Sequence, residues 1–246
     1  MRVDEIKRMY RFEDRYWWFV ARRDLVRLVL DRFVPRGLGL VVDVGCGTGA
    51  TLGLLARHGR VLALDRSGEA LACCRSRGQV PWLVRADAGR LPLAEGSVDL
   101  VNSLDLLEHL DDDAAAVGGF ARVLRPGGHL LVTVPAYRFL WSEHDAALDH
   151  RRRYSRGELL ALLDAAGLQP VLCSYTITSL LVPIYLFRVL LRALGKENLE
   201  QPKADLLELP GPLNALFTRL VMLESRLLLR FGLPFGVSLV CLARKG

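Results

Sequence analysis

Short aliphatic runs alternate with segments of helical apolar spacing over about the first 170 residues of the chain. The aliphatic runs predict buried strands, and the helical spacing predicts helices that pack one face on them. The predicted strands are Gly39–Val44, Val61–Leu64, Val80–Val84, Val98–Ser103, His129–Val134 and a run from about Gln169. The predicted helices are Phe19–Phe33, Ala50–His58, Gly68–Arg77, Asp113–Arg125 and a segment that starts after Ser155 and stops at Gly167. This alternation predicts an α/β fold with a mainly parallel, doubly wound sheet.

Acidic and hydroxyl residues mark the starts of two of these helices. Asp111, Asp112 and Asp113 supply an N-cap and an acidic first turn. Ser155 and Glu158 have the spacing of a capping box.

A segment of different composition separates the strand near Gln169 from a last predicted strand, Val237–Ala243. Residues 171–187 carry no charge, but Pro183 and several hydroxyl residues interrupt them, so we predict no membrane-spanning helix there. After a polar linker over residues 196–212, apolar residues from Leu213 to Phe231 predict an amphipathic helix. We therefore predict one domain, 1–246. Its parts are an N-terminal helical lid (1–36), a core (39–170), a helical insertion (176–236) and a last strand (237–244).

Composition narrows the class of protein only a little. The net charge is +6, but 29 of the 33 basic residues are arginine and no nucleic-acid-binding motif accompanies them, so we expect no nucleic-acid partner. The five cysteines have no CxxC spacing and read as small buried residues in a reducing cytoplasm. Peripheral contact with the inner membrane, and a homodimer, stay open as alternatives.

Three alternating glycines follow the first strand in the run Val41-Val42-Asp43-Val44-Gly45-Cys46-Gly47-Thr48-Gly49. Glycine lets a backbone approach a ligand closely, because it has no Cβ and tolerates positive φ. Asp65 closes the next strand, where a carboxylate can bind a ribose diol. The glycines and Ala50 also fit a dinucleotide pattern, so an NAD(P)-dependent oxidoreductase is a competing interpretation.

Further segments add to this pattern: Arg85-Ala86-Asp87-Ala88, Ser97–Ser103, Leu106-Leu107-Glu108-His109-Leu110 and Leu124-Arg125-Pro126-Gly127-Gly128. Together with the glycine loop they resemble the class I S-adenosylmethionine (SAM)-dependent methyltransferases over about residues 39–170. The resemblance implies a seven-stranded, Rossmann-like sheet whose last strand runs antiparallel beside the fifth. Residues 17–19 and 141–154 resemble a bacterial subgroup that methylates small molecules.

The resemblance implies a site for SAM, with S-adenosyl-L-homocysteine as product. The implied cofactor-binding residues are Asp43, Gly45, Cys46, Gly47, Asp65, Arg66, Asp87, Ala88, Ser103, Leu104, Trp18 and Arg23. In this assignment Asp43 lies near the ammonium group, Asp65 holds the ribose and Arg66 flanks the adenine. Asp87 and Ala88 meet the adenine edge. Ser103 and Leu104 lie beneath the sulfonium, Trp18 belongs to a stacking lid, and Arg22 or Arg23 reaches the carboxylate.

Methyl transfer requires alignment, exclusion of water and, for a hydroxyl acceptor, removal of one proton. Histidine is the natural base near neutral pH, and the candidates are His109, His144 and His150. The alternative is that these histidines only position the loops that carry them. His144 and Asp145 do not form a dyad by adjacency alone, since neighbouring side chains in an extended segment point apart.

The acceptor site is the least determined part of the sequence. Tyr137 and Trp141 could line a site for an apolar acceptor, and Tyr154 lies near them in the sequence. Arg152, in a run of three arginines, could bind a carboxylate or phosphate of the acceptor. The histidines and carboxylates form no metal-ligand set, so we predict no metal.

The leading hypothesis is a SAM-dependent methyltransferase that acts on a small, apolar acceptor, with an oxygen nucleophile favoured over nitrogen or carbon. The alternatives are a membrane-associated methyltransferase of a lipid-linked or quinone acceptor, the oxidoreductase, and a non-catalytic SAM-binding protein.

Overall fold

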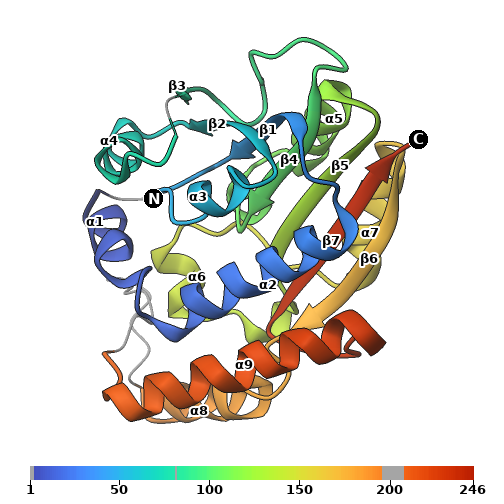
Figure 1. Cartoon of the computed structure of the whole chain (residues 1–246). Helices are drawn as coiled ribbons and strands as arrows, with labels where there is room; N and C mark the ends of the chain where they lie inside the picture. Colours follow the sequence, from blue (N-terminus) through green and yellow to red (C-terminus); the bar gives the residue numbers. More distant parts are fainter. Residues whose placement is uncertain (1–2, 81, 196–207) are drawn as a thin grey trace.

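The computed structural model describes residues 3–80, 82–195 and 208–246. Within them, seven strands form one sheet in the order β3-β2-β1-β4-β5-β7-β6 (Figure 1). The strands are β1 (Leu38–Val44), β2 (Gly59–Asp65), β3 (Trp82–Arg85), β4 (Val98–Leu104), β5 (Leu124–Pro135), β6 (Leu168–Thr176) and β7 (Ser238–Lys245). Neighbours from β3 to β5 are parallel, and β7 is antiparallel to β5 and β6. The predicted sheet and its antiparallel last strand are confirmed.

Helices cover both faces of this sheet. They are α1 (Val3–Phe12), α2 (Trp17–Phe33), α3 (Leu52–Leu55), α4 (Gly68–Arg77), α5 (Asp113–Val123), α6 (Glu143–Ala147), α7 (Arg156–Ala165), α8 (Leu181–Ala193) and α9 (Gly211–Phe231), with 3₁₀ turns η1 (Leu107–His109) and η2 (Arg138–Leu140). Apolar side chains of α5 and α7 pack on one face, and those of α2, α3 and α4 pack on the other. Successive strand residues alternate between the two cores, as Val41 and Val42 do.

The predicted helix starts are confirmed. Asp112 caps α5 by accepting a hydrogen bond from the backbone N–H of Ala115 at 2.8 Å. Ser155 and Glu158 form the reciprocal capping box of α7. These side chains satisfy backbone donors that the first turn of a helix leaves free.

Two predicted helix ends were wrong. The helix predicted over Ala50–His58 is only the single turn α3, because Gly59 pairs with Leu38 and draws the chain into β2. The helix predicted to reach Arg125 ends at Val123, because Leu124 pairs with β4 and begins β5.

The sequence analysis missed the first helix. No helix is predicted over residues 4–18, where basic and aromatic residues are mixed, yet α1 forms there. The helical spacing of Val3, Ile6, Met9 and Tyr10 is present in the sequence and was overlooked. In the structure Ile6 is buried, so packing also contributes to this helix.

Helices α8 and α9 lie between β6 and β7 in the chain and side by side at one end of the molecule (Figure 1). This is the place of the predicted insertion. The polar linker predicted over residues 196–212 lies largely outside the described residues. In the part of the chain that the structure describes, no helix is long and apolar enough to cross a bilayer.

Candidate functional site

The glycine loop follows β1 at the carboxyl edge of the parallel strands. Gly45, Gly47 and Gly49 all have positive φ, at 71°, 54° and 85°. A Cβ on Gly45 would lie 2.8 Å from Cδ1 of Leu106, and one on Gly49 would lie 2.9 Å from Sγ of Cys74. The loop therefore needs glycine both for its conformation and for its close packing.

The carboxylate of Asp65 closes this loop from the end of β2. Its two oxygens accept hydrogen bonds from the backbone N–H groups of Gly47 at 2.9 Å and Ser67 at 2.8 Å. Burial raises the pKa of Asp65. Asp65 pairs in register with Arg85, two residues before Asp87, so both predicted acids lie at the same sheet edge.

Asp43 lies deeper than a ligand-facing acid. It is buried and accepts hydrogen bonds from Asn102 Nδ2 at 2.6 Å and Thr51 Oγ1 at 3.1 Å. Burial raises its pKa to about 6. In this structure its contacts join β1, β4 and the turn before α3, and its predicted role near an ammonium group stays a prediction.

The other predicted cofactor residues surround the same edge. The Cys46 thiol lies 3.8 Å from the Cys74 thiol of α4. Ser103 is fully buried at the end of β4, and Leu104 beside it is half-buried. Arg66, Asp87 and Ala88 follow β2 and β3, where Arg66 and Asp87 are exposed and Ala88 is half-buried.

The N-terminal segment covers the glycine loop. A Cβ on Gly47 would lie 3.2 Å from Cε of Met9 in α1. Arg77 of α4 donates to Thr48 O at 2.9 Å and to Glu13 Oε1 at 2.6 Å, and so binds the loop and the N-terminal segment together. Burial raises the pKa of Glu13. These contacts hold the N-terminal segment against the glycine loop, and its role as a lid stays a prediction.

A narrow hollow lies beside this lid, at the end of β4. Trp18, Arg22 and Asp105 line it together with Thr133. Arg22 forms an ion pair with Asp105, whose φ of 47° is unusual for a residue other than glycine. Arg23 instead donates to the backbone carbonyl of Glu13. Of the two arginines considered for the SAM carboxylate, Arg22 thus lines the hollow.

The three candidate histidines gather in one place. The ring centroids of His109 and His150 are 4.8 Å apart, and those of His144 and His150 are 6.2 Å apart, both edge to face. The backbone N–H of His109 donates to the backbone carbonyl of Leu106, and the side chain of Leu106 packs on Gly45. The histidines therefore lie close to the glycine loop.

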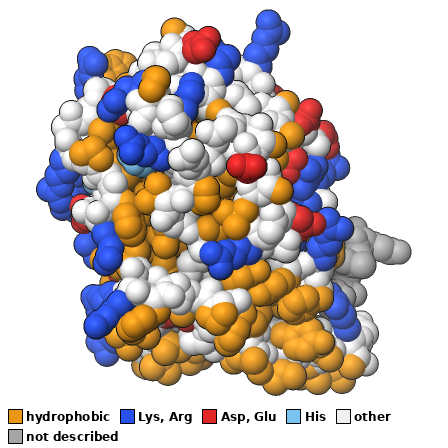
Figure 2. Space-filling model, turned by 90° about the vertical axis from the view of Figure 1, so that its right-hand side faces the viewer, with side chains coloured by type: hydrophobic (Ala, Val, Ile, Leu, Met, Phe, Trp, Pro, Cys, Tyr) orange, Lys and Arg blue, Asp and Glu red, His pale blue; other side chains and the backbone are white. Residues whose placement is uncertain are grey.

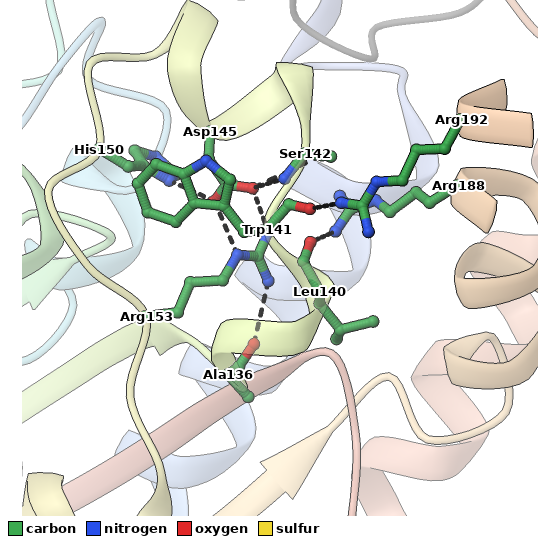
Figure 3. A network of polar contacts seen from close by, with 9 residues as sticks. All are labelled: Ala136, Leu140, Trp141, Ser142, Asp145, His150, Arg153, Arg188 and Arg192. Atoms are coloured by element: carbon green, nitrogen blue, oxygen red, sulfur yellow. Dashed lines mark hydrogen bonds and ion pairs between the residues drawn. The ribbon is translucent and has the colours of Figure 1, made fainter. Parts of the chain in front are cut away.

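Asp145 organises the histidine cluster (Figure 3). Its Oδ1 lies 2.9 Å from Nδ1 of His150 and accepts from Nε of Arg153 at 2.7 Å. Its Oδ2 accepts from Nη2 of Arg153 at 3.0 Å and from Ser142 N–H at 2.9 Å. Burial alone would raise the pKa of Asp145, but His150 and Arg153 hold it well below its usual range. Arg153 also donates to Ala136 O at 3.0 Å, just beyond β5.

The surroundings distinguish the three histidines chemically. Burial lowers the pKa of His109 to about 4 and that of His144 to about 3, so both are neutral at pH 7. His150 differs because it has a carboxylate partner on Nδ1. This partner orients the ring and favours the tautomer that leaves Nε2 as the proton acceptor.

One group of side chains has the spacing of a metal site. Glu108, His109 and His150 each place one ligand atom within 4.8 Å of the others. Neither carboxylate oxygen of Glu108 has a hydrogen-bond partner among the described residues, and burial raises its pKa well above the ordinary value. The sequence analysis predicted no metal and did not consider this group. Its third member, His150, lies 42 residues after Glu108 in the chain.

The predicted acceptor residues divide into two groups. Arg152 Nη1 and Tyr154 Oη both donate to Asp113 at 2.7 Å, and so fix the loop to the start of α5. Tyr137 stacks on Tyr175 with ring centroids 5.0 Å apart, and Trp141 is half-buried beside η2. Their roles toward an acceptor stay predictions.

Sequence reasoning missed Asp145 and Asp105 as parts of the site. His150 and Arg153 follow Asp145 by five and eight residues, a spacing that does not by itself indicate a contact. A helical turn and the loop after it bring both side chains onto the Asp145 carboxylate.

Comparisons with known proteins agree with this geometry. A family model described as a methyltransferase domain matches residues 42–132. A relative from Mycolicibacterium smegmatis, named a probable S-adenosylmethionine-dependent methyltransferase, is 35% identical over 161 residues, which are 64% of this chain and 61% of the relative. A ubiquinone biosynthesis O-methyltransferase from Xylella fastidiosa is 34% identical over 110 residues, covering 42% of this chain and 45% of that protein. The chain thus spans less than two thirds of either relative.

Solved structures show the same fold. A chain from the complex between the Haloferax volcanii Trm112 methyltransferase activator and a methyltransferase superposes with a TM-score of 0.63 at 20% identity. The match covers 98% of this chain and 93% of that one. The family match favours SAM over a dinucleotide as the ligand of the glycine loop. Residues 42–132 of this chain thus match a methyltransferase domain, and the chain is similar to proteins named as SAM-dependent methyltransferases.

Proposed function

We propose that this protein transfers a methyl group from SAM to a small, apolar acceptor, with an oxygen nucleophile favoured over nitrogen or carbon. The observation that supports this most is the Asp145–His150 pair. It lies at the sheet edge where β1 and β2 present Gly45 and Asp65. A nucleoside-binding loop and an oriented base therefore adjoin one another.

The residues present fit SAM. Gly45 and Gly47 have positive φ, a backbone conformation that lets the loop approach a nucleoside closely. Asp65 would hold the ribose hydroxyls in place of its hydrogen bond to Gly47. Arg22 would bind the carboxylate at the hollow beside Trp18. When bound, SAM supplies a methyl group on a positively charged sulfur.

His150 is the base that the contacts favour. As the acceptor oxygen receives the methyl group, its proton would pass to Nε2 of His150, and Asp145 would stabilise the resulting imidazolium. His109 and His144 are poorer bases because burial holds their pKa near 4 and 3. We assign them to the apolar wall around His150.

The test is label transfer from SAM carrying a labelled methyl group into a bacterial extract separated into small-molecule and lipid fractions. We expect label in a hydroxyl-bearing product with the wild-type protein and almost none with His150→Gln, while S-adenosylhomocysteine binds both equally. Equal transfer by the two proteins would refute the assigned base. Absence of label from every fraction would favour the non-catalytic SAM-binding protein instead.

The second candidate function is methylation of a lipid-linked or quinone acceptor at a membrane. The name of the Xylella relative, a ubiquinone biosynthesis O-methyltransferase, supports this class of acceptor. The exposed apolar side chains of α8 and α9 support it independently. The lipid fraction of the same assay separates the two candidates, because only the second expects its label there.

A further inference from the structure

The outer faces of α8 and α9 expose large apolar side chains over one end of the molecule. On α9 they are Leu216, Leu220, Leu223, Leu227 and Phe231, which are 38–73% exposed. On α8 they include Val182, Leu186 and Leu190, each more than half exposed. Figure 2 shows hydrophobic side chains gathered at this end, with basic side chains along its margins. A contiguous apolar surface of this kind marks an interaction site.

The same two helices are rich in positive charge. Five arginines and one acid lie within Leu181–Ala193 and Gly211–Phe231. The acid, Glu224, is buried and accepts hydrogen bonds from the backbone N–H groups of Thr178 and Ser179. The exposed charges of α9 are therefore all positive: Arg219, Arg226 and Arg230.

Helix α9 is held in place by its opposite side, so its outward leucine row does not result from loose packing of that helix. The opposite side of α9 buries Val221 and Leu228. Asn214 accepts a hydrogen bond from Trp17 N–H at 2.9 Å and donates to Arg15 O at 2.8 Å. α9 is thus attached to the N-terminal segment while its leucine row faces outward.

α8 is linked directly to the loop that carries the histidines. Arg188 donates to the carbonyl of Leu140, and Arg192 donates to the carbonyl of Trp141 (Figure 3). These carbonyls come just before α6, which contains His144 and Asp145. A ligand that holds α8 therefore also acts on the position of this loop.

An aromatic row leads from α8 toward the end of β5. Tyr185 of α8 meets Phe139 edge to face with centroids 5.8 Å apart, and Phe139 stacks on Tyr137 at 5.0 Å. Phe139 is 56% exposed. Tyr137 lies two residues beyond β5, on the edge of the sheet that bears the site.

We propose that the α8–α9 face docks on the surface of an anionic lipid bilayer. The leucine row would enter the boundary between headgroups and acyl chains, and the arginines would contact the anionic headgroups. A second copy of the chain is a poorer occupant. A face-to-face dimer would place the two sets of arginines in one interface with no exposed acid on either α9 to pair them.

This inference extends the proposed function. If the acceptor is a membrane lipid or quinone, docking by α8 and α9 would bring the bilayer next to the aromatic row, which ends at the sheet edge that bears the site. Docking itself is measured without SAM or acceptor, so its failure is distinct from a failure of the proposed function.

The test is co-sedimentation of the full-length protein with vesicles of phosphatidylglycerol and phosphatidylcholine in equal parts, and with vesicles of phosphatidylcholine alone. We expect binding to the anionic vesicles, and binding at least about tenfold weaker to the neutral ones. A triple variant, Leu216→Ser with Leu223→Ser and Leu227→Ser, should lose at least about tenfold in vesicle affinity. Arg219→Gln with Arg226→Gln and Arg230→Gln should lose a similar factor on anionic vesicles only.

Two control variants remove an exposed apolar side chain and three positive charges from other parts of the molecule. Trp82→Ser removes an exposed apolar residue from β3, at the far edge of the sheet. Arg57→Gln with Arg75→Gln and Arg90→Gln lowers the net charge by the same amount from other elements. Both controls should bind vesicles as the wild type does.

Several outcomes would overturn the proposal. One is that the wild-type protein does not sediment with anionic vesicles. Another is that the controls lose as much vesicle affinity as the α9 variants. The third is a dimer in solution that the leucine variant dissociates, while neither the wild type nor this variant binds vesicles. Unchanged circular dichroism and melting temperature establish that each variant is folded.

Discussion

Nδ1 of His150 lies 2.9 Å from Oδ1 of Asp145, a carboxylate that Arg153 also holds through two hydrogen bonds. Asp145 is completely buried, and the Arg153 side chain is 3% exposed. The negative charge is thus shared between a guanidinium and an imidazole in a place that excludes water. Such a pair fixes one ring orientation, which a base must have before the acceptor arrives.

Removal of the imidazole should affect turnover more than cofactor binding. We expect His150→Gln to lower kcat by a factor of about 10²–10⁴, the usual contribution of a general base. The affinity for S-adenosylhomocysteine should change less than about twofold. His144→Gln is the matched control and should retain most of the activity. The assignment fails if His144→Gln is the more damaging substitution.

Asp145→Asn should impair both stability and turnover. The substitution leaves the buried guanidinium of Arg153 without its carboxylate, and breaking a buried pair costs about 3–5 kcal/mol. Chemical denaturation measures this loss. In the protein that stays folded, kcat should fall while the affinity for S-adenosylhomocysteine is unchanged, because the ring of His150 loses the partner that fixes its orientation and tautomer. A kcat equal to that of the wild type would rule out the positioning role.

Asp65→Asn should weaken SAM binding. A hydrogen bond to a charged group contributes about 1.5–3 kcal/mol, so loss of one ribose contact predicts an affinity about 10–100-fold lower. The increase in melting temperature on addition of S-adenosylhomocysteine measures this change in affinity. Glu69→Gln, an exposed substitution at the start of α4, is the control. Equal stabilisation of Asp65→Asn and wild type would contradict the assignment.

Burial of His109 should make its contribution to stability depend on pH. Its folded pKa of about 4 lies below the ordinary value, so the fold favours the neutral ring. This contribution is present above about pH 6.5 and is lost as pH falls toward 4. Asp43 acts in the opposite direction, because its pKa is raised to about 6, so the comparison must be made between variants.

The difference in melting temperature between wild type and His109→Gln should therefore shrink steadily from pH 7 to pH 4.5. Ser76→Ala, which removes no titrating group, should differ from the wild type by a constant amount. A His109→Gln difference that is flat across this range would mean that the ring is solvated in the folded protein.

Replacement of Gly49 and of Gly118 by alanine should change the stability of the protein in opposite directions. Gly49→Ala should destabilise the protein by at least about 1–2 kcal/mol, since φ is 85° and Cys74 Sγ lies 2.9 Å from the added Cβ. Gly118→Ala, inside α5 with nothing within 4 Å of the added Cβ, should stabilise by about 0.5–1 kcal/mol. Urea titration measures both. The two variants should not change stability in the same direction.

The sequence predicted the sheet because its strands are buried on both faces and therefore appear as uninterrupted aliphatic runs. Helix starts were equally predictable, since Ser155 and Glu158 act within one turn. Helix ends were not, because pairing of Gly59 with Leu38 and of Leu124 with Val98 depends on distant strands.

The sequence analysis predicted those parts of the candidate site whose residues lie close together in the chain. The glycine loop and Asp65 belong to one βαβ unit, and the structure brings them together. The Arg22–Asp105 ion pair and the α8 contacts to Leu140 join segments 48 to 83 residues apart, which no periodicity encodes. Glu108 was missed because the group that it forms is completed by His150, 42 residues later in the chain.

The central claim is that the glycine loop and Asp65 form a SAM site, and isothermal titration calorimetry of the purified protein with S-adenosylhomocysteine tests it most directly. We predict one site with a dissociation constant in the micromolar range, about −7 to −8 kcal/mol. Absence of heat with both SAM and S-adenosylhomocysteine, together with a comparable signal from NADH, would contradict it.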